Sequence, residues 1–544
     1  MDQFPRGAAA IVGTATFGVG EAPGYTPNDM AALAGLAALE QANIGLNEVD
    51  GLFVCTSNDA LSGLGVAEYL GIRPAFTDNN RTGGSAFMSH VVMAALALDA
   101  GYCDVALVVH GSNQRTGAGG LVSMRQASPY ETPYRPLNPL SSYALAASRH
   151  MHVFGTTREH LAAVAVSARQ WANLNPEAFA QGPLTIDDVL AARMVSTPLT
   201  VRDCCLITDG AAAVVLVRAD RAKDHAAKPV YVIGGAAETW HADIASMPDL
   251  TATAASASGR RAYAMAGLGP ADIDVVQLYA AFSINTLLFL EDLGFCKKGE
   301  GGPFVASGAI APGGALPVNT NGGGLSYAHP GMYGLLAIVE AVRQLRGEAG
   351  ERQIPDAETA LAHGNGGTLS SQATLILGGA AAHRRGQARG TEARRHQLAE
   401  HQRTGHRAID RDVERRLCHL HHYGDRWCGV GGRAHPGREL RHTARLPRHQ
   451  QRGDHPCGTQ LGRNVRRDGE LSGWRRNSHH RAPGRLGDVD LRGRLGHPRR
   501  RQGLHGRRGR PPGLGRRRQG GGHRGRGDQQ PHRRHQGEAH PALG

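Results

Sequence analysis

The sequence predicts an α/β fold in which helices cover both faces of a mostly parallel sheet. Short apolar runs alternate with segments of helical spacing, as buried parallel strands alternate with their crossover helices. This succession occurs twice before residue 383, which suggests two similar halves. The composition then changes sharply at Arg384. We therefore divide the chain into residues 1–225, residues 226–383 and a basic, low-order tail, residues 384–544.

The first half is expected to hold four buried strands and four helices. Continuous apolar runs bounded by turn residues indicate the strands, and apolar residues spaced three and four apart indicate the helices. The expected strands are Ala8–Gly13, Gly51–Thr56, Asp104–His110 and the end of Met194–Val217. The expected helices are Asn28–Ala42, Ala86–Ala100, Arg158–Asn173 and Ile186–Arg193. A Pro-rich loop is expected at Tyr130–Tyr143.

The second half is expected to repeat this pattern. The expected strands are Tyr231–Ala236, Val275–Leu278 and Ala373–Leu377. The expected helices are Gly259–Gly267, Asn285–Leu293 and a clean amphipathic helix that ends at Gly347. In this interpretation, DVALVVHGS and AAAVVLV in the first half correspond to VVQLYAAF and QATLILGG in the second.

The stretch Asn319–Gly334, NTNGGGLSYAHPGMYG, organises the second half. Its three consecutive glycines let backbone approach a ligand closely and permit positive φ. The stretch holds a phenol, Tyr327, and an imidazole, His329, beside the start of a helix, where N–H groups favour a carbonyl oxygen that gains negative charge. The alternative is a structural His in a common kind of loop, and this stretch alone does not decide between the two.

Charge is distributed unevenly along the chain. Residues 384–544 carry 39 of the 61 Lys and Arg residues and 14 of the 47 Asp and Glu residues. The tail therefore has a formal charge of +25, and the residues before it have −11. The net charge of +14 describes the tail and says nothing about partners of the preceding residues.

The tail is rich in Arg, Gly, His and Pro and contains no Lys, Phe or Met. One interpretation is a basic arm that binds nucleic acid or an acidic partner, although Tyr423, Trp427 and Trp474 are its only aromatic residues. The other, which we favour, is GC-rich DNA translated out of frame. In either case the tail has too little apolar surface to form a core, and nucleic-acid binding is expected only if the tail is genuine.

The sequence excludes a membrane span and a disulfide framework. No run of eighteen apolar residues occurs, and the N-terminal MDQFPRGAAAIVG has too short an apolar run for a secretory signal. The eight Cys residues are scattered, and none lies in a C-x-x-C motif. We therefore expect a cytoplasmic setting and no metal site.

The segment NGGGLSYAHPG resembles the Gly-rich, His-Pro-Gly segment near the C-terminus of the thiolase superfamily. The resemblance covers roughly Ala8–Gly379 and is nearest to the branch of sterol carrier protein X and lipid-transfer proteins. It implies a five-layered fold of two similar halves, a homodimer, and no cofactor other than the coenzyme A of an acyl-CoA substrate. It also implies that His329 activates the thioester carbonyl. The substrate-binding candidates are Ser85, Gly84, Asn321, Gly323, Gly324 and Gly366.

The chain departs from this family where thiolases carry a nucleophilic cysteine, at the N-terminus of a buried helix. The matching loop, NNRTGGSAF, contains no Cys, and Arg81–Gly84 stand in its place. Ser85 is a substitute nucleophile in one interpretation, but a Ser at a helix start is more often an N-cap. The missing Cys argues against a covalent acyl-cysteine.

Three more residues are candidates for acid–base chemistry by the same resemblance. Tyr279 stands where relatives carry His-Asp or Tyr-Asp, with Ala280 in place of the Asp. A thiolase-like branch that cleaves steroid side-chain thioesters by a retro-aldol reaction uses two tyrosines, and Tyr279 and Tyr327 stand in suitable places. His363, in AHGNGG, stands where true thiolases carry a second catalytic Cys. For each, the alternative is a structural role at a strand end or in a loop.

We therefore expect an enzyme that acts on a lipid- or steroid-type acyl-CoA thioester, with catalytic candidates His329, Tyr327, Tyr279 and His363. Acyl transfer and retro-aldol cleavage of a β-hydroxyacyl-CoA compete, and the missing Cys favours cleavage. The alternatives are a non-catalytic subunit that binds acyl-CoA or lipid, and a basic nucleic-acid-binding protein that depends on the tail. Retro-aldol relatives work with an OB-fold partner protein, so the resemblance implies such a partner.

Overall fold

The computed structural model of the chain describes residues 4–56, 59–117, 129–225 and 228–385. Both interpretations of the tail concern residues that lie outside these ranges, apart from Arg384 and Arg385. Within the described residues, no helix has the length and the apolar character that crossing a membrane requires.

Nine strands form one mixed sheet in the order β3-β2-β4-β7-β1-β8-β11-β10-β9. Their bounds are β1 Ala9–Gly20, β2 Gly51–Val54, β3 Phe76–Asp78, β4 Val105–Ser112, β7 Asp209–Arg218, β8 Val230–Thr239, β9 Val275–Leu278, β10 Thr359–Gly366 and β11 Ser371–Gly378. A second, two-stranded sheet joins β5 Met194–Ser196 to β6 Leu199–Thr200.

Eleven α-helices have both ends within the described residues, and a further helical segment begins at Ala380. Their bounds are α1 Pro27–Gln41, α2 Ser62–Leu70, α3 Ala86–Asp99, α4 Leu140–Phe154, α5 Arg158–Asn173, α6 Ile186–Ala191, α7 Ala222–His225, α8 Ala255–Ala266, α9 Ser283–Asp292, α10 Gly301–Ala306 and α11 Gly334–Arg346. As expected, α11 ends at Gly347, which adopts a φ of 75° that suits glycine.

The two halves of the sheet have the same topology. In the first half, β2 is parallel to β4, β4 is antiparallel to β7, and β7 is antiparallel to β1. In the second half, β9, β10, β11 and β8 repeat these three relationships in the same order. The halves join where Ala10 and Ile11 of β1 pair with Tyr231 and Val230 of β8. The prediction of two similar halves is therefore confirmed.

The correspondence between the halves differs from the one expected at one strand. The partner of β4 in the repeat is β10, Thr359–Gly366, and the segment VVQL of β9 corresponds instead to β2. Gly364 and Gly366 favour a loop in the sequence, but both belong to strand β10. These glycines allow β10 to lie close to α3 and to the loop before it. A Cβ added to Gly364 would lie 2.5 Å from Met88 Sδ, and a Cβ added to Gly366 would lie 1.7 Å from the Thr82 carbonyl oxygen.

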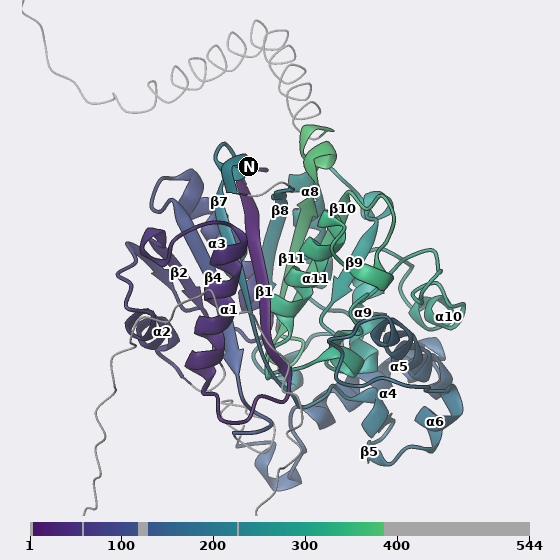
Figure 1. Ribbon diagram of the computed structural model, residues 1–544. Coiled ribbons are helices and arrows are strands. Elements are labelled where there is room, and N and C mark those ends of the chain that lie inside the picture. Colours follow the sequence, from purple (N-terminus) through teal and green to yellow (C-terminus); the bar gives the residue numbers. More distant parts are fainter. Residues whose placement is uncertain (1–3, 57–58, 118–128, 226–227, 386–544) are drawn as a thin grey trace, which may run out of the picture. The chain divides into compact units, whose positions relative to one another are not determined.

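The helices complete five layers around the two halves of the sheet (Figure 1). Helix α1 packs on β1, β4 and β7 of the first half, and α8 packs on β8 and β11 of the second. Helices α3 and α11 lie between the halves and contact strands of both. Because these two helices are covered on both sides, most residues of both are buried. Helix α3 is apolar over most of its length, whereas α11 is amphipathic and also buries Glu340, Gln344 and Arg346.

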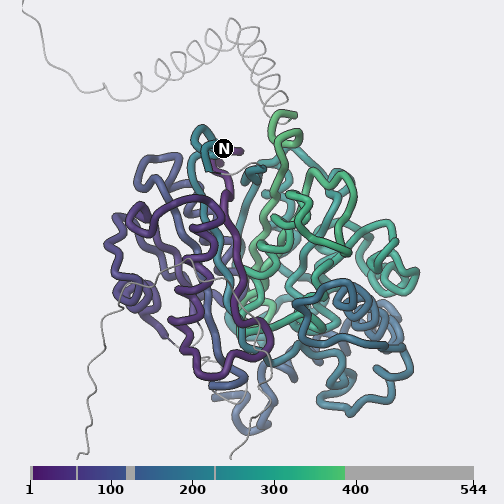
Figure 2. The backbone as a smooth tube through the Cα atoms, viewed as in Figure 1, coloured from purple at the N-terminus to yellow at the C-terminus, as the bar shows by residue number. Residues whose placement is uncertain are grey.

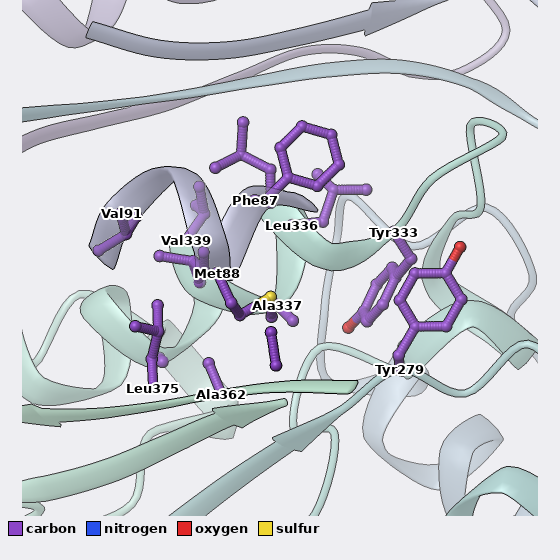
Figure 3. Close-up of a cluster of buried hydrophobic side chains, with 14 of the residues drawn as sticks. Phe87, Met88, Val91, Tyr279, Tyr333, Leu336, Ala337, Val339, Ala362 and Leu375 are labelled. Atoms are coloured by element: carbon purple, nitrogen blue, oxygen red, sulfur yellow. The ribbon is translucent and has the colours of Figure 1, made fainter. Parts of the chain in front are cut away.

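The contact between α3 and α11 fixes the centre of the molecule. Figure 3 shows Phe87, Met88 and Val91 of α3 facing Leu336, Ala337 and Val339 of α11. All six are buried, and each large apolar side chain contributes about 1.5–3 kcal/mol relative to an exposed one. At their N-termini the helices touch through backbone, since a Cβ added to Gly334 would lie 2.0 Å from the Gly84 carbonyl oxygen.

A long insertion between β4 and β7 holds α4, α5 and α6. These helices gather with β5 beside α9 and α10 (Figure 1), and the tube in Figure 2 follows the described part of this path. Helix α5 has the bounds expected from its periodicity, whereas the start of α4 lies in Tyr130–Tyr143, where an irregular loop was expected. Helix α4 forms because Tyr143, Ala146 and Ala147 share a buried face, although its first turn has no side-chain cap.

Candidate active site

A cavity of about 1140 Å³ lies where β9 and β10 end and where α3 and α11 begin. Ligands of α/β proteins commonly bind at the carboxyl ends of parallel strands. Small-molecule sites usually measure about 300–1,000 Å³, so this cavity has room for a bulky ligand. Two helix N-termini face it, since Gly83 and Gly84 precede α3, and Gly331 and Met332 precede α11. Oriented N–H groups at such ends favour negative charge on a ligand.

Tyr279 and His329 form a buried pair in the cavity wall. The Tyr279 hydroxyl lies 2.9 Å from His329 Nε2, and the two rings are nearly perpendicular. Burial lowers the pKa of His329 to about 4. Burial also raises the pKa of Tyr279 well above its usual value, against a smaller lowering effect of a backbone hydrogen bond from Tyr333. At neutral pH the pair is therefore a neutral phenol that shares one hydrogen bond with a neutral imidazole.

The backbone around His329 is held by three hydrogen bonds. Its N–H donates to Thr208 Oγ1 at 3.0 Å, and its carbonyl oxygen accepts from Gln114 Nε2. The carbonyl oxygen of Pro330 is bonded to His110 Nε2 at 2.9 Å. These contacts fix the imidazole ring against Tyr279. Within the described residues Nδ1 of His329 is buried and has no side-chain hydrogen-bond partner.

The ring of Tyr279 occupies the space next to Gly84. A Cβ added to Gly84 would lie 1.8 Å from Tyr279 Cε2, and its three nearest atoms all belong to that ring. A Cβ on Gly83 would lie 3.1 Å from the Cα of Gly366. The loop before α3, where the sequence analysis found no Cys, therefore has no space for a nucleophilic side chain at residue 84.

Ser85 is the N-cap residue of α3, as expected, but its side chain makes no capping bond to the helix. The hydroxyl is fully buried and bonded to Thr82 Oγ1 and Ser371 Oγ, each at 3.0 Å. These partners are hydroxyl groups, which cannot serve as the general base that a nucleophilic serine requires. Ser85 instead links α3 to β11.

Cysteine side chains are present in the cavity wall but are held as thiols. Cys55, after β2, and Cys205, between β6 and β7, both line the cavity. Burial raises the pKa of each thiol to about 12. Because the thiolate is the nucleophilic form, neither cysteine is prepared for acyl transfer.

Two of the expected catalytic residues lie away from the cavity. The Tyr327 hydroxyl donates to Glu177 Oε2 at 3.0 Å, and Arg343 donates to the same oxygen. His363 lies on β10, where its ring nitrogens are bonded to Gln372 Oε1 and Thr374 Oγ1, each at 2.9 Å. Neither residue belongs to the lining, so the structure does not place four catalytic candidates around one ligand.

The expected substrate-binding residues also divide into two groups. Gly84 and Gly366 line the cavity, whereas Asn321, Gly323 and Gly324 do not. Asn321 Oδ1 accepts from the Gly323 N–H and from the Tyr333 hydroxyl. The close backbone approach expected at this Gly-rich stretch is made to the protein itself, because a Cβ on Gly324 would lie 2.3 Å from the Ala280 carbonyl oxygen.

Three residues of the lining were not singled out from the sequence. Asn365 lies two positions after His363 in AHGNGG. This motif did indicate a functional residue, but the role was assigned to the histidine. Tyr143 lies on α4, and its ring stacks on Phe282 with centroids 4.3 Å apart. His241 Nε2 lies 3.1 Å from the Thr368 carbonyl oxygen, an acceptor, so Nε2 is the protonated nitrogen. No sequence pattern connects Tyr143 or His241 to this cavity.

Comparison with known proteins agrees with this architecture. The family described as "Thiolase C-terminal domain-like" matches residues 236–379. Acetyl-CoA acetyltransferase from Methanothermobacter thermautotrophicus is 35% identical over 382 residues, which are 68% of this chain and 98% of that protein. The chain belongs to the thiolase superfamily, and it is a member in which the expected cysteine before α3 is replaced.

Two further relatives carry names that refer to carbon–carbon cleavage. The 17-hydroxy-3-oxo-4-pregnene-20-carboxyl-CoA lyase of Mycobacterium tuberculosis is 38% identical over 359 residues, which are 63% of this chain and 92% of that protein. A solved structure of an "Ltp2-ChsH2(DUF35) aldolase" is 34% identical, with a TM-score of 0.63, and the match covers 69% of this chain and 98% of that one. The relatives of this chain thus include proteins named for acyl transfer and proteins named for aldol cleavage.

Proposed function

We propose that this chain catalyses retro-aldol cleavage of a β-hydroxyacyl-CoA thioester with a bulky, lipid- or steroid-type acyl group. The observation that carries the proposal is the position of Tyr279, whose ring takes the space beside Gly84 and whose hydroxyl is bonded to His329. The site thereby has a paired phenol and imidazole in place of a nucleophile.

The reaction needs a path for one proton and a site for one developing negative charge. The β-hydroxyl group gives its proton to the Tyr279 oxygen while the phenolic proton moves to Nε2 of His329. The bond between Cα and Cβ then breaks, its electron pair forms the thioester enolate, and the former β-carbon leaves as a carbonyl group. Return of the proton to Cα gives the shortened acyl-CoA. The N-termini of α3 and α11 face the cavity and favour the enolate oxygen.

The size of the cavity and the names of the relatives support a bulky substrate. A cavity of about 1140 Å³ has room for a bulky ligand. Relatives at 38% and 34% identity are named for cleavage of a steroid-type thioester and of a steroid side chain. Coenzyme A enters the proposal as part of the substrate, and no other cofactor is needed for the steps above.

The proposal includes two protein partners. Strand β3 is at the edge of the sheet, with Tyr102 beside its Phe76, and such an edge is open to a second copy of the chain. The name of the solved aldolase, "Ltp2-ChsH2(DUF35) aldolase", joins two components, which supports a partner protein for this chain. The resemblance implies that this partner has an OB fold. Light scattering of the purified chain, alone and with such a partner, tests both. A strictly monomeric wild type would reject the homodimer.

The cytoplasmic location remains part of the proposal. Five cysteines in the described residues, Cys55, Cys103, Cys204, Cys205 and Cys296, are free, which suits a reducing compartment.

Acyl transfer is the second candidate, because the acetyltransferase relative is 35% identical. The two reactions differ in a covalent intermediate, so mass spectrometry after exposure to an acyl-CoA separates them. We expect no acyl adduct on Cys55, Cys205 or Ser85, together with release of a ketone or aldehyde from a β-hydroxyacyl-CoA. An adduct on any of these residues would support acyl transfer, and tight binding with no turnover would support a binding subunit.

A further inference from the structure

A row of buried polar side chains runs along the β10–β11 pair and ends at the cavity. His363 lies opposite Thr374 and Asn365 lies opposite Gln372 in the antiparallel register. Since side chains two apart on a strand share a face, these four lie on the same face of the pair. We call them the polar row. All four are at least 98% buried.

The hydrogen bonds of the polar row have one consistent direction. Gln372 Nε2 donates to Asn365 Oδ1 at 2.8 Å, which leaves Gln372 Oε1 to accept from His363 Nε2 at 2.9 Å. His363 is then protonated at Nε2, and its Nδ1 accepts from the Thr374 hydroxyl. The far end of the row is anchored by Ser258, 2.9 Å from Thr374.

This direction fixes the side-chain amide of Asn365. Its oxygen must face Gln372, so its nitrogen must face the other way, where Nδ2 donates to the Tyr143 hydroxyl at 2.8 Å. An amide nitrogen has two N–H donors. Within the described residues Nδ2 bonds to that one hydroxyl, so a second N–H is left for a ligand of the cavity that Asn365 lines.

We propose that the Asn365 side-chain amide binds the thioester carbonyl oxygen, and that His363 is a positioning residue that orients this amide through Gln372. The inference rests on the proposed function, since the ligand is the thioester of that reaction. Asn365 follows His363, whose carbonyl oxygen accepts from the Tyr279 N–H, so the amide and the Tyr279–His329 pair lie at neighbouring strand ends. The Asn365 amide would bind the thioester oxygen while the Tyr279–His329 pair moves the proton of the β-hydroxyl group.

Core packing alone does not account for the polar row. The same face of a buried strand pair is normally filled by apolar side chains, because each buried polar group must be satisfied to avoid a cost of about 1–3 kcal/mol. Here every member of the polar row is hydrogen-bonded, with Ser258 at one end and Tyr143 at the other. The second N–H of Asn365 Nδ2 is left as a donor toward the cavity. A fully bonded network of this kind fixes a single orientation of its members.

The test compares two ligands that differ at one oxygen. Binding is measured by calorimetry for a thioester, acetyl-CoA, and for its thioether counterpart, S-ethyl-CoA, which lacks the carbonyl oxygen. We expect the wild type to bind the thioester more tightly, and Asn365→Ala to lose about 2- to 10-fold in thioester affinity with thioether affinity unchanged. Asn365→Asp, which presents an acceptor to the oxygen, should lose at least as much.

His363→Leu should reproduce this selective loss, because it removes the Nε2–H donor that orients Gln372. The matched control is Ser258→Ala, which removes the anchor of the row but leaves the Thr374 hydroxyl to donate to His363, so the thioester preference should persist. Equal weakening of both ligands in Asn365→Ala and Asn365→Asp, or an unchanged preference in both, would overturn the proposal. If the wild type cleaves no β-hydroxyacyl-CoA but the thioester preference depends on Asn365, the oxygen site stands and the proposed reaction fails.

Discussion

The ring of Tyr279 and a side chain at residue 84 exclude each other. The separation of 1.8 Å between Tyr279 Cε2 and a Cβ built on Gly84 is far inside van der Waals contact. A side chain at residue 84 and a tyrosine at the end of β9 are therefore alternatives within one fold. Part of the loop Arg81–Gly84, where the expected cysteine is missing, is thus closed to any side chain by Tyr279.

The first prediction concerns this exclusion. Gly84→Ala should destabilise the protein by about 1–3 kcal/mol, the usual cost of overpacking a core. Adding Tyr279→Ala should remove most of that penalty, because the three atoms nearest the new Cβ all belong to the Tyr279 ring. Urea denaturation of the two single variants and the double variant gives the coupling energy. Strictly additive effects would show that the two residues do not share this space.

The second prediction concerns turnover. Tyr279→Phe and His329→Ala should each lower the rate of β-hydroxyacyl-CoA cleavage by about 10²–10⁴, the usual loss for a positioned acid or base. Tyr327→Phe is the matched control, since it removes a buried phenolic hydroxyl that bonds to Glu177 outside the cavity. Its rate should stay near that of the wild type. Wild-type rates in the first two variants would reject the pair as catalytic.

The third prediction concerns the pH dependence of turnover. Burial lowers the pKa of His329 to about 4 and raises that of Tyr279 well above its usual value. Between the lowered pKa of His329 and the raised pKa of Tyr279, both side chains stay neutral. We therefore expect kcat to be nearly constant from about pH 6 to pH 9. Initial rates at saturating substrate check this. A bell-shaped pH profile of kcat centred near pH 7 would show that another titrating group controls the reaction.

The fourth prediction concerns stability in acid. Burial lowers the pKa of His90, His329 and His363 to about 4 each. In the unfolded chain these groups titrate near ~6.5, so between pH 6.5 and 4 the unfolded state binds more protons. Stability should therefore fall as the pH falls through this window, by up to ~1.4 kcal/mol per histidine and pH unit.

Urea unfolding at pH 7 and pH 5 measures this loss. His90→Phe removes one of the three groups at a site between Phe53 and Phe87, away from the cavity lining, and should reduce the difference between the two pH values. The prediction fails if the wild type is equally stable at both.

The fifth prediction concerns the C-terminal boundary. All nine strands of the sheet end by Gly378, so a chain truncated after residue 385 should fold and melt at the temperature of the full chain. If nucleic acid binds the full chain, the truncated chain should lose that binding, and the affinity of the full chain should fall steeply with salt. An insoluble truncated chain would show that the tail belongs to the fold.

Much of the architecture could be predicted from periodicity and apolar runs. Helix α5 and strand β9 have the expected bounds, and α11 ends at the expected glycine. Strand β10 was missed because its glycines serve close packing against α3, and glycine in a sequence more often signals a turn. Packing of this kind depends on a segment far away in the chain, which a local pattern does not reveal.

The candidate site was predicted in part for a related reason. Tyr279 and His329 were both named from the sequence, and the structure brings them to 2.9 Å from each other. Tyr327 is only two residues from His329, but Gly323–Tyr327 forms a single π-helical turn and Ala328 is extended, so the two side chains leave the backbone toward different surroundings. The direction of a side chain in non-periodic backbone cannot be read from its neighbours in sequence.

The pairing of β1 with β8 has a consequence for which part of the cavity wall can change. Backbone hydrogen bonds between β1 and β8 join the two halves at their edges. The halves therefore cannot open about a hinge without breaking the sheet. Residues of Glu131–Pro139, in the insertion between β4 and β7, form part of the cavity wall. This part of the wall comes from a segment that the two similar halves do not share, so it can be altered without disturbing the pairing that holds the halves together.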